Sequence, residues 1–522
     1  MVATMPMHRH WIACQYEAAV ARAADLQDNG DRPMLTDRRT LMTQGALLGA
    51  GLASGTLAPI AAAQTGAKGG YVSKRPAPAD RRFVSKAVER EIAGVSRMIA
   101  DPEVAWLFAN CYPNTLDTTV RMGMVDGKPD SFVITGDIPC LWLRDSAAQV
   151  KSYLHLASQD AKLRELFRGL IARHARSVLI DPYANAFMED PTAPTSLGWA
   201  KEDVTEMRPG VAERKWEIDS LCYSMRLSHG YWTATRDATP FDAQWADAMR
   251  AIVRTFREQQ RKDGPGPYKF QRASRQPTET LLAGYGAPTV KNGMIHSGFR
   301  PSDDACQYLL FVPANLFAVT TLREMAQVAS EARNDNALAN DAAALADEVA
   351  AAVAQHGTMR LADGSDVWAY EVDGYGNAIF MDDANVPSLS SLAWLGCVPA
   401  GDARWQRTAK AAWSEANPWF FKGTAGEGIG GPHQGMNYIW PMSLIVRALS
   451  ATDDATILRC LATLKRTHAG TGFMHEAFEK DDAAKFSRDW FAWANGLFGE
   501  LILHIAATRP QLLKASLDTI RV

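Results

Sequence analysis

Residues 136–150, GDIPCLWLRDSAAQV, contain the pattern that decides the fold. A loop that carries Trp142, Arg144 and Asp145 leads directly into a helix-forming run. Five more segments repeat this pattern of carboxylates or aromatics followed by a helical run: 215–232, 300–319, 381–396, 437–450 and 486–506. They follow one another at intervals of roughly 50 to 85 residues, which fits helix-loop-helix units with variable loops better than a short-period solenoid.

Amphipathic segments lie between these six starts. The runs at 161–179, 245–260 and 339–357 place apolar residues at three- and four-residue spacing, which is typical of helices with one buried face. Strand-like alternation is scarce, and 132–138 and 363–376 are expected to form short hairpins at the rim. Six inner and six outer helices predict an all-α fold, an (α/α)6 toroid, whose inner helices present polar residues toward one mouth.

The acidic residues at these helix starts also have a structural explanation. Ser302, Asp303 and Asp304 precede an apolar run, as do Asp382 and Asp383, so both sets are expected to act as N-caps. Such residues stabilise the helix dipole by under about 1 kcal/mol each without any chemistry. Capping does not explain why Arg, Trp, His and Gly cluster beside them, so a shared functional site is the alternative interpretation.

Composition describes a soluble globular protein and excludes two classes of function. The 522 residues are 47% hydrophobic and 22% charged, with a formal net charge of -3, so no basic field for nucleic acid is present. The seven cysteines form no C-x-x-C pair and no Cys/His cluster, so no metal site is expected. One or two disulfides are compatible with an exported protein. Of the 15 Trp, about half are expected in the core and the others against sugar rings.

The N-terminus has the layout of an export signal. Arg38 and Arg39 precede a mildly apolar Gly/Ala/Leu stretch that ends in small residues at Ala63, which is typical of a twin-arginine signal peptide over residues 34–63. The stretch is too Gly-rich and short for a stable membrane anchor. Residues 1–33 are predicted to be a non-native or mis-assigned extension, 64–82 a linker and 83–522 the catalytic domain. A periplasmic or secreted protein, with the twin-arginine translocation machinery as a partner during export, is expected.

Two carboxyl groups in different loops are the candidates for chemistry. Glycosidic bond cleavage needs one protonated and one ionised carboxyl group on either side of the scissile bond. The first candidate is Asp303 or Asp304, where Arg300 would keep one of the two ionised. The second is Glu476 in TGFMHEAF, for which a solvated surface acid is the structural alternative.

Other residues around these loops are suited to binding sugar. Trp142 offers a flat ring, while Arg144 and Asp145 together suit two adjacent hydroxyls; a buried ion pair is the alternative. The Gly-rich stretch 423–441 lacks the GK[ST] ending of a phosphate loop and is expected to bring backbone close to a ligand. The full predicted substrate-binding set is Trp142, Arg144, Asp145, Arg300, Asp304, Asp383, Asn385, Glu427, His433 and Trp440.

Five long motifs in order resemble glycoside hydrolase family 125, from about residue 85 to the C-terminus. They are GDIPCLWLRDSAAQV, FRPSDDACQYLLFVPAN, DDANVPSLSSLAWLG, GTAGEGIGGPH and WFAWANGLFGELI. The resemblance implies an (α/α)6 fold, removal of terminal α-1,6-linked mannose from a glycan or oligosaccharide, inversion at the anomeric carbon, and no metal or other cofactor. It also implies an Asp general acid and a Glu general base, which fall on Asp303 and Glu476, with Asp304 still open as the acid.

Three alternatives remain at this point. An inverting α-glucosidase of the glucoamylase type would act on an α-glucoside and not on an α-mannoside. A non-catalytic periplasmic glycan-binding protein would bind sugar without turnover. A calcium-dependent mannosidase would lose activity in chelator.

Overall fold

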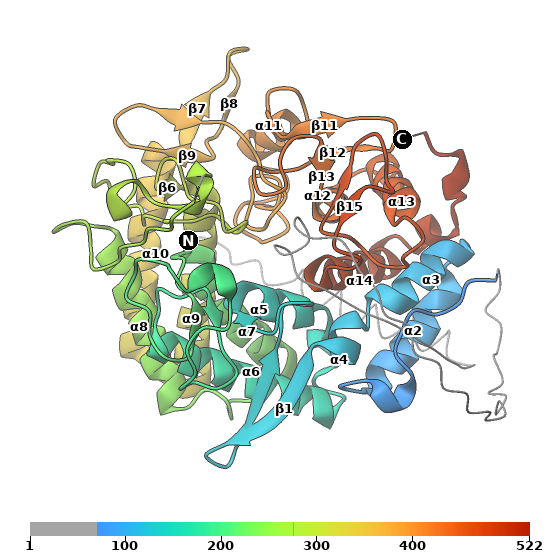
Figure 1. Ribbon diagram of the computed structural model, residues 1–522, viewed down its shortest axis with the longest axis horizontal. Helices are drawn as coiled ribbons and strands as arrows, with labels where there is room; N and C mark the ends of the chain where they lie inside the picture. Colours follow the sequence, from blue (N-terminus) through green and yellow to red (C-terminus); the bar gives the residue numbers. More distant parts are fainter. Residues whose placement is uncertain (1–69, 275, 522) are drawn as a thin grey trace, which may run out of the picture.

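The computed structural model describes residues 70–274 and 276–521, and this part of the chain is mostly helical (Figure 1). Among these residues no helix is both long and apolar enough to cross a membrane. The α-helices are α2 (Lys86–Met98), α3 (Pro102–Cys111), α4 (Asn114–Thr118), α5 (Leu143–Val150), α6 (Ala161–Ile180), α7 (Ile218–Thr235), α8 (Ala243–Gln259), α9 (Val312–Arg333), α10 (Asn336–His356), α11 (Ala403–Ala412), α12 (Pro441–Ser450), α13 (Asp454–Thr467) and α14 (Ala492–Thr508).

Short antiparallel sheets connect the helices at one end. The strands are β1 (Val120–Val125), β2 (Lys128–Val133), β3 (Leu141–Trp142), β4 (Ala186–Phe187), β5 (Val211–Glu213), β6 (Leu310–Phe311), β7 (Thr358–Arg360), β8 (Asp366–Trp368), β9 (Glu371–Val372), β10 (Ala378–Ile379), β11 (Phe420–Lys422), β12 (Glu427–Ile429), β13 (Tyr438–Ile439), β14 (Ala477–Glu479) and β15 (Phe486–Ser487). They pair as β1-β2, β3-β4-β5, β10-β9-β6, β7-β8, β11-β12 and β13-β14-β15.

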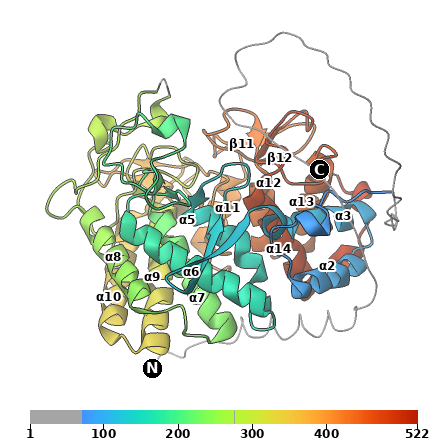
Figure 2. The same cartoon turned by 60° about the horizontal axis from the view of Figure 1, so that its bottom comes forward.

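Five of the six predicted helix starts are confirmed. Helices α5, α7, α9, α12 and α14 begin within the quoted segments, and each follows a strand of one of these sheets by at most a few residues. Because a strand fixes the chain just before the first helical turn, the residues at these helix starts are held rigidly. In Figure 2 the long helices α6, α8, α9 and α10 fill the lower part of the view, and many connecting loops gather above them.

The sixth predicted helix, in segment 381–396, is wrong. Residues 388–396 form turns, with the serine side chains hydrogen-bonding locally: the Ser388 amide donates to Ser391 Oγ at 2.8 Å. Asp382 accepts the amides of Leu389 and Ser390 at 2.7 and 2.9 Å, so it caps a turn and not a helix. Serine side chains that bond neighbouring backbone compete with helix formation in this way.

The predicted cap at Ser302 to Asp304 is also wrong. Helix α9 begins only at Val312, and its N-cap Phe311 provides no side-chain hydrogen bond. Residues 299–305 instead form a tight loop, in which the Asp303 amide donates to the Arg300 carbonyl at 2.9 Å. The acidic pair is therefore held by a loop ahead of the helix.

The three helices predicted from amphipathic spacing are confirmed as α6, α8 and α10. Their N-caps Asp160, Asp242 and Asp335 accept backbone amides of the first turn, which explains where each helix begins. Helix α6 contacts α8, and α10 contacts α9. Helix α5 contacts both α7 and α14, α7 contacts α9, and α12 contacts α13 and α14. One continuous apolar core runs through all of these helices.

The hairpin predictions are partly confirmed. Segment 363–376 contains the strands β8 and β9, but they do not pair with each other: β8 pairs with β7, and β9 pairs with β10 and β6. Segment 132–138 only overlaps the end of β2, which pairs with the earlier strand β1. The six cysteines among the described residues are free thiols.

The export signal and the first extension lie outside the described residues. The predicted linker, residues 64–82, falls within the described residues from residue 70 onward, and there the chain is anchored to the helices. Arg75 is buried, and its Nε donates to Asp117 at 2.7 Å while its guanidinium also binds Glu89. The folded part of the protein therefore begins before residue 83.

Candidate active site

A cavity of about 400 Å³, partly open to solvent, lies where several helices begin. Trp142, Trp440 and Phe491 line it and are the N-caps of α5, α12 and α14. Sheet β13-β14-β15 brings the starts of α12 and α14 together, and α5 contacts α14, although the three helices are far apart in the sequence. Eight of the twelve predicted site residues line the cavity: Trp142, Arg144, Asp145, Asp303, Asn385, His433, Trp440 and Glu476.

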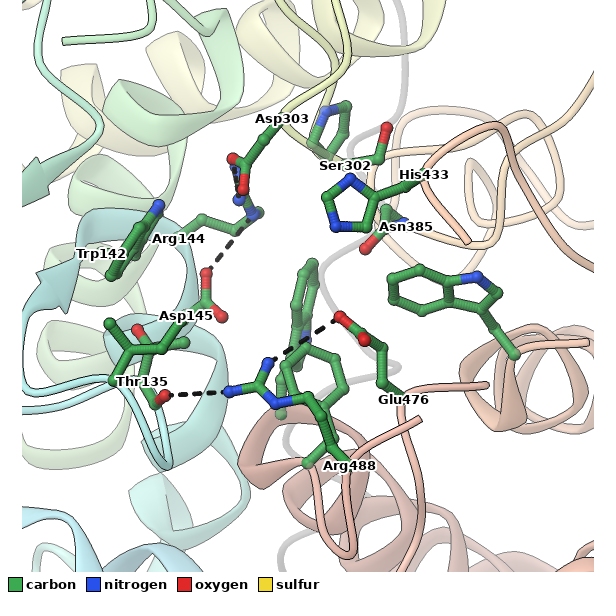
Figure 3. Close-up of a pocket in the computed structure, with 15 residues that line it drawn as sticks. Thr135, Trp142, Arg144, Asp145, Ser302, Asp303, Asn385, His433, Glu476 and Arg488 are labelled. Atoms are coloured by element: carbon green, nitrogen blue, oxygen red, sulfur yellow. Dashed lines mark hydrogen bonds and ion pairs between the residues drawn. The ribbon is translucent and has the colours of Figure 1, made fainter. Parts of the chain in front are cut away.

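Asp303 and Glu476 point into this cavity from different sides (Figure 3). Asp303 comes from the 299–305 loop and has a left-handed backbone, with φ of 67°. Its side chain keeps 26% of its surface exposed. Asp304 is buried outside the cavity lining, where it accepts a hydrogen bond from Ser302 Oγ at 3.2 Å. Of the two adjacent acids, the structure therefore presents Asp303 to a ligand.

Two cations hold Asp303. Arg144 Nη2 donates to Asp303 Oδ1 at 3.2 Å, and Lys215 Nζ donates to the Asp303 carbonyl at 2.6 Å. Burial by itself raises the pKa of Asp303, but the positive charges of Arg144 and Lys215 outweigh it and hold that pKa below its ordinary value. Arg144 therefore has the role that the sequence analysis gave to Arg300.

Arg144 is the centre of a buried acidic cluster. Its Nη1 lies 2.6 Å from Glu217 and 3.2 Å from Asp219, and its Nε lies 3.5 Å from Asp145. Burial raises the pKa of Asp145 to about 7, that of Asp219 to about 6 and that of Glu217 well above its ordinary value. Among the described residues, no group of three or more His, Cys, Asp and Glu side chains is arranged to hold a metal ion.

Sequence reasoning missed Glu217 and Asp219, although they lie in one of the six quoted segments. Glu217 is the N-cap of α7, and Asp219 lies in the first turn of that helix. Acids at a helix start are ordinary features, so only their contact with Arg144, from α5, distinguishes them. That contact depends on α5 and α7 lying side by side, which the sequence does not reveal at the level of single residues.

Glu476 lies immediately before strand β14 and is surrounded by hydrogen-bond donors. Its Oε2 accepts from Gln434 Nε2 at 2.7 Å and from Ser487 Oγ at 3.3 Å, and its Oε1 lies 3.8 Å from Arg488 Nη1. Donors of this kind favour the ionised form of a carboxyl group. Glu476 is 2% exposed, so the alternative of a solvated surface acid is wrong.

Arg488 is a second functional candidate that sequence reasoning missed. Its backbone is left-handed, with φ of 61°, and its guanidinium binds Asp137, lies near Glu476 and stacks 5.0 Å from the Phe491 ring. It lines the cavity and connects the 135–138 loop to the strand that carries Glu476 (Figure 3). An Arg in the FSRDWF stretch had no distinguishing neighbour in sequence.

Aromatic rings supply most of the remaining wall. The indole N–H groups of Trp142, Trp440 and Trp493 are buried and have no hydrogen-bond partner among the described residues. An unpaired buried donor costs roughly 1–3 kcal/mol, so these three rings are held in place by packing and not by hydrogen bonds of their N–H groups. Trp216 and Trp245, by contrast, are core residues, in line with the expected division of the tryptophans.

Four predicted binding residues do not line the cavity. Arg300 Nε donates to Glu371 at 2.6 Å, so its predicted pairing with the adjacent acids is wrong. Glu427 lies on β12 and forms ion pairs with Lys422 and Arg447. Asp383 is buried behind the wall and accepts both the amide and the side chain of Asn385 at 2.9 Å. Asn385 itself lines the cavity, so Asp383 orients a residue of the wall. The fourth predicted residue that does not line the cavity is Asp304, described above.

Comparisons with known proteins agree with this site. The family model described as metal-independent alpha-mannosidase (glycoside hydrolase family 125) matches residues 101–503. A solved metal-independent alpha-mannosidase of Streptococcus pneumoniae, in a non-productive complex with alpha-1,6-mannobiose, is 37% identical with a TM-score of 0.78. The match covers 82% of this chain and 100% of that one.

A second relative covers a similar part of the sequence. The meiotically up-regulated gene 157 protein of Schizosaccharomyces pombe is 42% identical over 458 residues, which is 84% of this chain and 90% of that protein. Both relatives and the family model span nearly all of the helical region that carries the cavity. The chain therefore belongs to glycoside hydrolase family 125, the metal-independent alpha-mannosidases.

Proposed function

We propose that this protein is an inverting exo-α-1,6-mannosidase in which Asp303 is the general acid and Glu476 the general base. The observation that carries the proposal is the placement of these two carboxyl groups on different sides of one cavity (Figure 3). The streptococcal relative, crystallised with alpha-1,6-mannobiose, supports the choice of linkage.

In this mechanism Asp303 donates a proton to the departing glycosidic oxygen as the bond to the anomeric carbon breaks. Glu476 takes a proton from a water molecule that attacks the anomeric carbon from the opposite face, so the released sugar is the β-anomer. Gln434 and Ser487 donate hydrogen bonds to Glu476 and orient its carboxyl group in the cavity. Arg144 and Asp145 line the cavity and are suited to bind sugar hydroxyls.

The proposal includes the (α/α)6 toroid. Helices α5, α7, α9, α12 and α14 would be inner helices, with the turns at 388–396 in the sixth inner position. The contacts of α5 with α7 and α14, of α7 with α9, and of α12 with α14 support a closed inner ring. Helices α6, α8 and α10 would lie outside it.

The stereochemistry of the first product tests the reaction. We expect residues 70–522 with α-1,6-mannobiose in EDTA to release β-mannose first, measured as a time course of the anomeric proton signals by NMR. An initial α-anomer would refute inversion. Activity that disappears in EDTA and returns with calcium would instead favour a calcium-dependent enzyme, and turnover of an α-glucoside alone would favour a glucoamylase-type enzyme.

We also propose that residues 34–63 direct export through the twin-arginine route to the periplasm or beyond. The support is the Arg38 and Arg39 pair followed by the Gly/Ala/Leu stretch. In a bacterium with this route, replacing both arginines by lysine is expected to keep mannosidase activity in the cytoplasmic fraction. Unchanged periplasmic activity in that variant would contradict the proposal.

A further inference from the structure

We propose that Glu217, which lies behind Asp303 and does not line the cavity, is a positioning residue that shares one proton with Asp303 and keeps it available for the glycosidic oxygen. This inference rests on the proposed role of Asp303 as general acid. Glu217 is 1% exposed, whereas Asp303 keeps a quarter of its side chain open to the cavity. Only Asp303 of the two can therefore touch a substrate.

The geometry joins the two carboxyl groups. Arg144 contacts both, with its Nη1 2.6 Å from Glu217 and its Nη2 3.2 Å from Asp303. The Asn185 amide nitrogen lies 3.4 Å from an oxygen of each. The two carboxyl groups therefore share one guanidinium and one amide nitrogen as common partners, which places them side by side.

The balance of charges around Arg144 indicates that one of these acids is protonated. Four carboxyl groups, those of Asp145, Glu217, Asp219 and Asp303, surround the single guanidinium of Arg144. The next cation is Lys215, which contacts the Asp303 carbonyl and is also 3.7 Å from Glu279. These positive charges do not balance four buried negative charges, and burial without compensation favours a protonated acid. The nearby Glu213 accepts a hydrogen bond from Asn185 at 3.3 Å, but Arg272 Nη2 lies 2.8 Å from it and balances its charge.

The direction of the two pKa shifts places the proton on Glu217 at rest. Burial raises the pKa of Glu217 well above its ordinary value, whereas Arg144 and Lys215 lower that of Asp303 despite its burial. An acid with a lowered pKa would be ionised near neutral pH and could not protonate a leaving group by itself. The shared proton solves this, because the pair titrates as one unit and loses its last proton only at higher pH.

The proton balance over one turnover is complete. The proton held by the pair passes through Asp303 to the glycosidic oxygen, which keeps the electrons of the broken bond. Water supplies its hydroxide to the anomeric carbon and its proton to Glu476. That proton returns to the pair through solvent, so the protein is unchanged and one water is consumed.

The test compares two substrates in Glu217→Gln. Glutamine has the shape of a protonated glutamate, so a purely structural hydrogen bond would survive the change. It cannot release a proton, so hydrolysis of α-1,6-mannobiose at pH 7 is expected to fall about 100-fold, as for the loss of general acid catalysis. Hydrolysis of α-mannosyl fluoride, whose leaving group needs no proton, is expected to stay near the wild-type rate and to show that the variant is folded.

The pH profile supplies a second readout. Asp303 without Glu217 loses its proton at lower pH, so the basic limb of kcat/KM for mannobiose is expected to move to lower pH in Glu217→Gln. In Ser220→Ala it is expected to move a fraction of a pH unit the other way. The reason is that Ser220 Oγ donates to Glu217 Oε2 at 2.8 Å and stabilises the ionised form. Asp219→Asn is the matched control, since Asp219 contacts Arg144 and not Asp303. This variant is expected to change the hydrolysis rates of both substrates by the same factor.

The outcomes separate the two proposals. If the wild type hydrolyses neither substrate, or if Asp303→Asn behaves as wild type, the proposed function fails and this inference fails with it. Suppose that Asp303→Asn loses hydrolysis of mannobiose only. If Glu217→Gln then hydrolyses mannobiose at the wild-type rate, or loses hydrolysis of both substrates equally, the inference about Glu217 alone is overturned. An unshifted basic limb in both Glu217→Gln and Ser220→Ala would also overturn it.

Discussion

Asp303→Asn is expected to remove nearly all hydrolysis of α-1,6-mannobiose while leaving hydrolysis of α-mannosyl fluoride close to the wild-type rate. A mannose alkoxide is a poor leaving group and needs a proton, whereas fluoride leaves without one. General acid catalysis contributes roughly 10² to 10⁴ in rate, so a loss of about 10³-fold in kcat on mannobiose is the expected size. Initial rates with both substrates at the wild-type pH optimum measure it.

The substitution suits the site because asparagine keeps the size of the side chain. Arg144 retains its contacts with Glu217, Asp219 and Asp145, so the cluster is expected to stay assembled. Asp304→Asn is the matched comparison, since Asp304 is the neighbouring acid and is buried outside the cavity. If Asp304→Asn and not Asp303→Asn showed the leaving-group dependence, the acid would be Asp304.

The helical architecture was predictable because it depends on local patterns. Apolar residues at three- and four-residue spacing correctly located α6, α8 and α10, and the aromatic and acidic starts located α5, α7, α9, α12 and α14. The wrong prediction of a helix in segment 381–396 has a local cause that the spacing of apolar residues does not indicate. The alternating serines bond their own backbone, and Asp382 stabilises the resulting turn.

Individual partners in the site were less predictable than its outline. Eight of the twelve predicted residues line the cavity, because residues at the starts of neighbouring helices meet at the same mouth. Arg300 was assigned to the adjacent acids by proximity in sequence, yet Glu371, from a strand 71 positions later, takes its side chain. Which charge pairs with which depends on contacts between distant segments, and no spacing rule supplies those.

The same reason explains why Glu217 and Arg488 were missed. Each side chain is unremarkable in its own segment and acquires meaning only from a partner more than 70 residues away or from another loop: Arg144 for Glu217, and Asp137 for Arg488. The electrostatic consequence follows from those contacts. Burial of Glu217 raises its pKa, while cations lower that of Asp303, so the pKa values of these two acids shift in opposite directions.

Glu476→Gln is expected to lower hydrolysis of α-1,6-mannobiose and of α-mannosyl fluoride by the same large factor, about 10³-fold. The attacking water must lose a proton whichever group departs, so the loss of a general base cannot be compensated by a better leaving group. Glutamine still fits beside Gln434, Ser487 and Arg488, which contact the native carboxylate. The rates with both substrates, and the melting temperature of the variant, measure the effect.

Glu479→Gln is the matched control for this prediction. Glu479 is the last residue of strand β14, three residues after Glu476, and accepts the amides of Asp481 and Asp482 outside the cavity. It is expected to keep the wild-type rate with both substrates. A Glu476→Gln variant that no longer hydrolysed mannobiose but still hydrolysed α-mannosyl fluoride would identify Glu476 as the proton donor. Since Asp303→Asn is expected to give that pattern, the two variants together assign acid and base by opposite responses to the leaving group.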